Sequence, residues 1–155
     1  MASRNPMNDF LTKLKHGIDC PTVEATRSIA RELAAHLPHD CTLALHGDLG
    51  VGKTTFVGGL AEAWHITDPI TSPTFNLLSC YTGKRTLLHL DAYRLESEAD
   101  MESLFLDDLL ESPYCLVVEW PQKIEGMLHE PIWHVELSIQ SEGLHHVQLK
   151  TYTTE

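Results

Sequence analysis

Positive charge is scarce in this chain of 155 residues, which has 11 Lys and Arg residues against 22 Asp and Glu residues and a formal net charge of −11. Proteins that grip a nucleic-acid backbone need clustered Lys and Arg to neutralise its phosphates. We therefore expect no strong direct binding to nucleic acid. The negative net charge does not argue against binding to partner proteins.

Long apolar runs and paired cysteines are also missing. The polar segment 1–19 holds no stretch suited to a signal peptide or a membrane span, so we expect a cytoplasmic protein with no membrane partner. No C-x-x-C pair occurs, which argues against zinc-ribbon or thioredoxin chemistry. We expect ordinary, mostly buried thiols at all four cysteines, which are Cys20, Cys41, Cys80 and Cys115.

What the sequence does have is the string G-x-x-x-x-G-K-T at 47–54, the pattern of a phosphate-binding P-loop. The apolar run 41–45 before it predicts a buried strand, and 55–64 after it predicts a helix. This context separates a P-loop from a glycine-rich turn with an incidental lysine. The glycines let backbone N–H groups converge on phosphate, Lys53 can reach the β- and γ-phosphates, and the Thr54 hydroxyl can sit on Mg²⁺. The predicted nucleotide-binding residues of this segment are Gly47, Asp48, Gly50, Val51, Gly52, Lys53, Thr54 and Thr55.

Strands and helices alternate along the chain, which predicts an α/β fold: one P-loop NTPase domain with a mostly parallel mixed sheet, flanking helices and a C-terminal β-hairpin. We place this domain at 22–150, after an N-terminal extension 1–21 and before a short tail 151–155. The predicted elements are helix 22–37 with Thr22 as its N-cap, strand 41–46, helix 55–64, strands 76–81 and 86–90, a helix within 96–111 whose apolar face carries Met101, Leu104, Phe105 and Leu109, strand 115–119, and a hairpin over 135–149.

Two acids stand at the ends of predicted apolar strands, Asp91 after 86–90 and Glu119 at the end of 115–119. Ligands of open α/β sheets lie at the carboxyl ends of the strands, so both acids should end near the phosphates. We assign Glu119 to the metal side and Asp91 to the γ-phosphate or its water, although sequence alone allows the two to exchange roles. The alternatives are that Asp91 caps a turn and that Glu119 pairs with a surface lysine.

A hydroxyl-rich loop at 71–75 offers Thr74 as a switch residue that can reach Mg²⁺ and respond to the γ-phosphate. The alternative is an ordinary Ser-Pro turn. No Asn-Lys-x-Asp string is present to read guanine, so adenine is the default base and ATP the expected nucleotide.

Four strings occur together: Gly-Asp-Leu-Gly-Val-Gly-Lys-Thr-Thr at 47–55, Ser-Pro-Thr-Phe at 72–75, His-Leu-Asp-Ala-Tyr-Arg-Leu at 89–95 and Val-Glu-Trp-Pro at 118–121. In this order they resemble the TsaE (YjeE) family of bacterial P-loop ATPases, over residues 22–150. The resemblance implies a role in making threonylcarbamoyladenosine, a modified base next to the tRNA anticodon. It implies docking on the TsaD–TsaB pair, which performs the transfer, and ATP hydrolysis that resets the assembly between turnovers.

The resemblance also implies roles for individual residues. Lys53 would contact the phosphates, Thr54 and Glu119 would hold Mg²⁺, and Asp91 would be needed for hydrolysis. The adenine would lie near the first helix, beside Thr26, and Trp120 would sit beside the nucleotide pocket.

The chain departs from the family pattern at two positions. Val51 stands where alanine is usual, a mild change because this position contributes backbone. Leu144 stands where arginine commonly follows the hairpin glycine, and His145 and Lys150 are nearby candidates for whatever that arginine does.

Apart from Lys53, few basic residues lie near the predicted site; Arg94 is one. A second positive group on the developing charge is worth ~10³–10⁵ in rate, so we expect slow hydrolysis that a partner stimulates. One alternative is a nucleotide-switched protein-binding module with incidental hydrolysis. A small-molecule kinase ranks last, because the chain lacks the Arg-rich cluster of a phosphate-covering lid.

Overall fold

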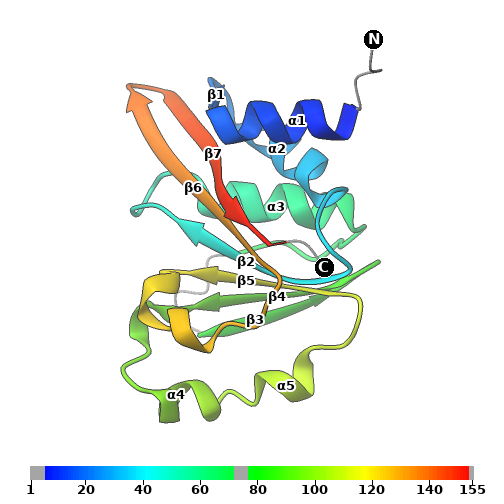
Figure 1. Cartoon of the computed structure of the whole chain (residues 1–155), viewed down its shortest axis with the longest axis vertical. Helices are drawn as coiled ribbons and strands as arrows, with labels where there is room; N and C mark the ends of the chain where they lie inside the picture. The colour runs from blue at the N-terminus through cyan, green and yellow to red at the C-terminus, as the bar shows by residue number, and fades with distance from the viewer. Residues whose placement is uncertain (1–5, 72–76, 154–155) are drawn as a thin grey trace.

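The computed structural model of the protein describes residues 6–71 and 77–153. Its centre is a seven-stranded sheet (Figure 1). The strands are β1 Ile18–Cys20, β2 Asp40–His46, β3 Leu78–Thr82, β4 Thr86–Asp91, β5 Tyr114–Glu119, β6 Ile132–Ser141 and β7 Leu144–Tyr152. The helices are α1 Pro6–His16, α2 Val23–Ala34, α3 Lys53–Ala63, α4 Glu98–Glu102 and α5 Leu106–Leu109, with 3₁₀ turns η1 Ala92–Arg94, η2 Pro121–Lys123 and η3 Glu125–Met127.

The strand order is β1-β7-β6-β2-β5-β4-β3. The central run β6-β2-β5-β4 is parallel. The hairpin β3–β4 adds antiparallel β3 at one edge, and on the other side the hairpin β6–β7 adds antiparallel β7, which pairs with edge strand β1. The predicted α/β fold, with its parallel centre and C-terminal hairpin, is confirmed. The carboxyl ends of the parallel strands β2, β4 and β5 therefore lie together at one end of the strands, where the P-loop follows β2.

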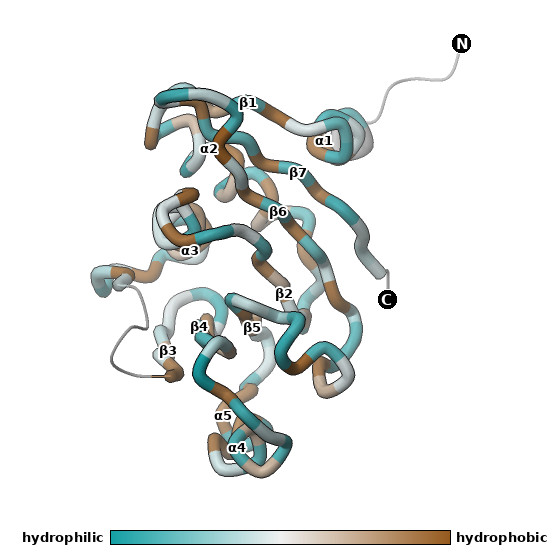
Figure 2. The backbone as a smooth tube through the Cα atoms, turned by 90° about the vertical axis from the view of Figure 1, so that its left-hand side faces the viewer, coloured by the Kyte–Doolittle hydropathy of each residue, from teal (hydrophilic) through white to brown (hydrophobic). Residues whose placement is uncertain are grey.

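Alternate side chains of the central strands feed two apolar cores on opposite faces of the sheet. In β4, Leu87 belongs to the core with α1, α2 and α3, whereas Leu88 and Leu90 belong to the core with η1, α4 and α5. In β5, Val117 and Val118 divide in the same way. Figures 1 and 2 show α4 and α5 at the end of the molecule opposite α1 and α2.

The first predicted helix is confirmed as α2, and its predicted N-cap is confirmed too. The Thr22 hydroxyl accepts a hydrogen bond from the Ala25 N–H at 3.0 Å, which satisfies one of the free donors of the first turn. The helix then packs closely on α3 at Gly59, where a Cβ atom would lie 2.5 Å from the Arg27 carbonyl oxygen. Only glycine allows this approach, which presses α2 against the helix of the P-loop.

The N-terminal extension contains α1 and β1, two elements that no pattern in the sequence predicts. β1 pairs with β7 through only three residues, too few to show an alternation of apolar and polar side chains. Phe10 and Leu14 of α1 are buried in the core beside β7. Within the described ranges, none of the helices is long and apolar enough to cross a membrane.

The helix predicted within 96–111 begins as α4, with Ser97 as its N-cap, but the prediction of one continuous helix is wrong, because the chain breaks between α4 and α5. Phe105 has a left-handed backbone with φ 51°, and its side chain is 69% exposed rather than on an apolar face. Leu109 is exposed as well. Met101 and Leu106 would lie about 140° apart on a continuous helix, and the break lets both face the sheet.

Among the cysteines, Cys80 departs from expectation, because it is exposed on edge strand β3.

Candidate functional site

The P-loop lies between β2 and α3, as predicted, and its glycines take conformations that other residues avoid. Gly47, Gly50 and Gly52 have φ values of 144°, 86° and 103°. A Cβ atom on Gly47 would lie 2.5 Å from the Leu137 carbonyl oxygen of β6. The loop is therefore a cradle of bare backbone at the start of α3, the arrangement that binds phosphate groups.

Lys53, the first residue of α3, is only 6% exposed and points back across the loop. Its Nζ atom donates a hydrogen bond to the Gly47 carbonyl oxygen at 2.8 Å and lies 3.4 Å from Oε1 of Glu119. It also lies 5.0 Å from the centre of the Trp120 ring. One ammonium group thus connects the P-loop to the end of β5.

Glu119 is buried and sits between two basic side chains. Its Oε2 atom lies 2.7 Å from Nε2 of His89, a fully buried residue of neighbouring β4, and Lys53 faces its other oxygen. The distance is that of an ion pair, and the imidazole nitrogens of His89 make no well-aligned hydrogen bond with a described residue. Burial raises the pKa of Glu119, but the His89 imidazole and the Lys53 charge outweigh it, so this pKa is lowered. The carboxylate is held ionised inside the protein.

Asp91 ends β4 directly beside Glu119, because the two residues are register partners in the parallel pair β4–β5. Its Oδ1 atom also accepts a hydrogen bond from the Tyr93 N–H at 3.0 Å and caps η1. The capping role considered for Asp91 is therefore present in the structure. It coexists with a position beside the buried carboxylate, so it does not remove Asp91 from the site.

Trp120 follows Glu119 with a left-handed backbone, φ 57°. Its ring stacks at a tilt against Tyr93, with 5.2 Å between ring centres, and Tyr93 is 59% exposed. A tryptophan in this strained conformation is uncommon and is typical of functional sites. Sequence reasoning assigned no role to Tyr93, although it lies in the string 89–95 on which the family resemblance rests.

His145 of β7 contacts the P-loop directly. Its Nδ1 atom lies 2.9 Å from the Val51 carbonyl oxygen. The neighbouring candidate Lys150 is exposed further along the same strand. Beside the loop, the segments 47–51 and 136–139 line a recess of about 570 Å³. His145 thus holds the loop from the side of the C-terminal hairpin.

The remaining predicted residues lie around this centre or away from it. Thr54 and Thr55 line a second, shallow pocket of about 310 Å³ with Arg27 and Asp68. Asp48 is exposed on the loop. Thr26 is buried in α2, near the Cys20 thiol, and the contacts described for it do not reach the loop. Thr74 lies outside the described residues.

A cation at this site would need oxygen ligands from few protein groups. The described ranges contain no cluster of three or more His, Cys, Asp or Glu residues able to hold a metal ion. Magnesium ions in nucleotide sites use one or two protein oxygens together with phosphates and water, so no such cage is required. The ionised Glu119 carboxylate and the Thr54 hydroxyl, next to the glycine cradle, fit a nucleotide with Mg²⁺.

The chain is similar to known proteins of one family. The sequence pattern of the family described as "Threonylcarbamoyl adenosine biosynthesis protein TsaE" matches residues 20–148. The chain is 42% identical over 121 residues to the tRNA threonylcarbamoyladenosine biosynthesis protein TsaE of Bacillus subtilis, covering 77% of this chain and 74% of that protein. It is 36% identical to the protein of the same description from Treponema pallidum, over 69% and 79% of the two chains. Its fold is similar to the crystal structure of Bacillus subtilis YdiB, with a TM-score of 0.70, 30% identity and coverage of 86% and 82%.

Proposed function

Because the chain belongs to the TsaE family of threonylcarbamoyladenosine biosynthesis proteins, we propose that it binds ATP with Mg²⁺ and hydrolyses it slowly within the tRNA modification machinery. The hydrolysis acts on the TsaD–TsaB pair and permits repeated turnover. The observation that carries this proposal is the buried group formed by Lys53, Glu119 and His89 beside the P-loop. A protein that only bound phosphate would not require an ionised, buried carboxylate beside the P-loop.

Nucleotide binding follows from the loop geometry. Backbone N–H groups of the glycine cradle would bind the phosphates, and the positive end of α3 would add to their attraction. Lys53 would exchange its bond to the Gly47 carbonyl for a phosphate oxygen, because both acceptors lie within reach of one flexible ammonium group. Trp120 would border the phosphates, since its ring already lies beside that ammonium group.

Thr54 and Glu119 would hold Mg²⁺, directly or through its water shell. When bound, the ion neutralises charge that develops on the phosphates during transfer. His89 keeps Glu119 ionised and fixed in direction. Asp91, next to Glu119, would orient the attacking water, and its bond to the Tyr93 N–H holds the carboxylate in place for that task.

Slow hydrolysis in the absence of a partner is supported by the charges around the site. Of the Lys and Arg residues in the described ranges, Lys53 is the one that contacts Glu119; Lys123 lies 5.7 Å from the centre of the Tyr93 ring, and Arg94 is exposed on η1. A partner that adds a positive group would supply the missing stabilisation of the transition state. We place this activity in the cytoplasm, where tRNA is modified, with the TsaD–TsaB pair rather than tRNA as the direct contact, because the net charge is −11.

The test is steady-state ATP hydrolysis by the purified chain, alone and with the TsaD–TsaB pair, with Lys53→Ala as the blank. We expect slow turnover alone and strong stimulation by the pair. ATP bound without any stimulation would favour the alternative, a nucleotide-switched binding module. Glu119→Gln also distinguishes the proposed ATPase from the binding module. For the proposed ATPase, the variant should still bind ATP but lose both hydrolysis and repeated turnover of the modification reaction.

A further inference from the structure

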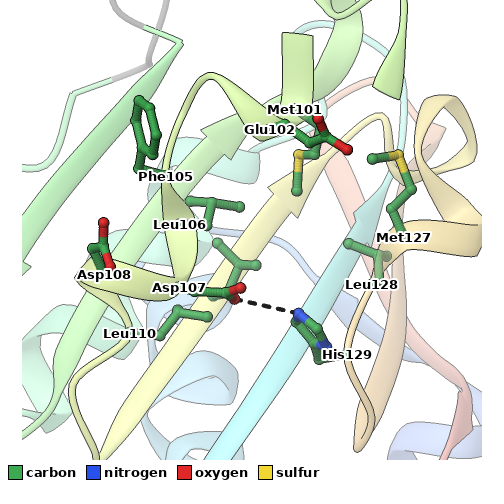
Figure 3. Close-up of a pocket in the computed structure, with 11 residues that line it drawn as sticks. Met101, Glu102, Phe105, Leu106, Asp107, Asp108, Leu110, Met127, Leu128 and His129 are labelled. Atoms are coloured by element: carbon green, nitrogen blue, oxygen red, sulfur yellow. Dashed lines mark ion pairs between the residues drawn. The ribbon is translucent and has the colours of Figure 1, made fainter. Parts of the chain in front are cut away.

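A groove of about 390 Å³ lies on the sheet face that carries α4 and α5, between these helices and the segment 127–129 (Figure 3). This is the face opposite the core that contains α1, α2 and α3, the P-loop helix. Its floor is apolar and is formed by Met101, Leu106, Leu110, Leu116, Met127 and Leu128. Two of these side chains are methionines, which adapt their shape to different apolar partners.

The rim of the groove is acidic. Glu102, Asp107 and Asp108 line it, and Asp107 reaches across to His129 at 3.5 Å, as the dashed line in Figure 3 shows. The surrounding segment 96–111 contains no Lys or Arg. Its seven acids are Glu96, Glu98, Asp100, Glu102, Asp107, Asp108 and Glu111. An apolar floor inside a strongly negative rim selects against anything that carries negative charge.

Phe105 stands at the edge of the groove in an unusual state. Its backbone is left-handed, with φ 51°, and the residue is 69% exposed, in the short connection between α4 and α5. A non-glycine residue in this conformation costs about 1–2 kcal/mol. A large aromatic side chain that is both strained and exposed is typical of a binding anchor rather than of a surface shaped for stability alone.

We propose that this groove receives a segment of a partner protein that carries an apolar side chain flanked by Lys or Arg residues. The apolar side chain would enter among the methionines and against Phe105, and the basic residues would meet the acidic rim. A second copy of this chain is a poor occupant, because it brings its own net charge of −11 to the rim. A nucleic acid is repelled for the same reason.

The inference rests on the proposed function only for the identity of that protein, which we take to be the TsaD–TsaB pair. The groove itself is tested first with a synthetic peptide of Leu and Lys. Its Leu residues are spaced so that they lie on one face of an amphipathic helix, and its Lys residues lie on the other face. Calorimetry would compare its affinity for the full-length chain, for Phe105→Gly and for the double variant Asp107→Lys, Asp108→Lys. Glycine suits a positive φ, so Phe105→Gly is compatible with this backbone conformation and removes the whole side chain.

We expect both variants to bind the peptide at least tenfold more weakly than the native chain, and added salt to weaken the native complex. Val23→Ala, at a comparably exposed apolar residue, and Glu142→Lys, at an exposed acid in the hairpin turn, should bind like the native chain. Equal binding by the native chain and by both groove variants would overturn the proposal. So would a scrambled peptide that binds the native chain with the same affinity as the designed peptide.

The same variants are then measured for docking on the immobilised TsaD–TsaB pair and for basal ATP hydrolysis. Docking weakened at least tenfold, with basal hydrolysis unchanged, would support the groove as the partner site. If both variants dock as well as the native chain does, the groove is not the docking site for the pair, and the proposed function remains intact. Peptide binding at the groove without any docking of the native chain on the pair would support the groove and overturn the partner named in the proposed function.

Discussion

Nε2 of His89 lies 2.7 Å from Oε2 of Glu119, inside the protein and next to the P-loop lysine. The two residues come from neighbouring parallel strands and point to the same face of the sheet, since His89 pairs in register with Val117, two residues before Glu119. Burial raises the pKa of Glu119, but the contact with His89, together with the Lys53 charge, lowers it overall.

Replacing His89 by leucine should therefore destabilise the protein. The variant keeps a similar volume but removes one partner of a buried charge, which costs about 3 kcal/mol or more in comparable pairs. Urea unfolding at neutral pH would measure the change. A matched replacement on the same strand, Leu88→Met, should cost less than about 1.5 kcal/mol, because it conserves volume and breaks no ion pair. Similar losses in the two variants would contradict a role for the ion pair.

The lowered pKa of Glu119 predicts how stability depends on pH. Its ionised form contributes stability that is fully present above the ordinary glutamate value of about 4.3 and is lost as the pH falls through the lower value in the folded protein. The difference in unfolding free energy between the native chain and Glu119→Gln should therefore shrink as the pH falls below about 4. A difference that stays constant from neutral pH to that acidic range would show that Glu119 does not have a lowered pKa.

Two variants separate the capping role of Asp91 from a catalytic role. Asp91→Asn keeps an oxygen that can accept from the Tyr93 N–H but removes the charge, whereas Asp91→Ala removes both. We expect both to lose hydrolysis, and only alanine to lose about 1 kcal/mol of stability. Turnover assays and thermal unfolding would measure this. Normal turnover in the asparagine variant would mean that Asp91 acts through the cap alone.

Neighbouring glycines of α3 should respond in opposite directions to alanine. A Cβ atom on Gly58 meets nothing within 4 Å, so Gly58→Ala should stabilise the helix by about 1 kcal/mol. A Cβ atom on Gly59 would lie 2.5 Å from the Arg27 carbonyl oxygen and 2.7 Å from Cβ of Ala30, so Gly59→Ala should destabilise the protein and push α2 away. Denaturant unfolding of the two variants gives the comparison. Equal shifts would show that α2 and α3 do not pack as closely as described.

Trp120 should report nucleotide binding by its fluorescence. Its ring lies 5.0 Å from Nζ of Lys53, which would turn toward phosphate when ATP binds. The other two tryptophans, Trp64 and Trp133, are buried away from the loop and provide the constant background. We expect an ATP-dependent change in emission that Trp120→Phe abolishes. The same change in Trp120→Phe would place its origin elsewhere.

Local patterns were enough to predict most of the fold. The P-loop, the strand before it and the helix after it are set by glycine spacing and apolar runs within a few residues, and the same is true of the Thr22 cap and of the C-terminal hairpin. At 96–111 the local signals predicted the start of α4 but missed the break at Phe105, which lets both Met101 and Leu106 pack against the sheet. They also missed α1 and β1, whose positions depend on β7 at the far end of the chain.

By itself, then, the sequence determined which residues can meet phosphate and that two acids end neighbouring strands, because these properties depend on residue type and short spacing. Only the tertiary structure decided that His89 contacts Glu119 and helps to keep it ionised, and that His145 contacts the loop at Val51. Those contacts join strands far apart in the chain, and their register is set by packing of the whole sheet rather than by any local pattern.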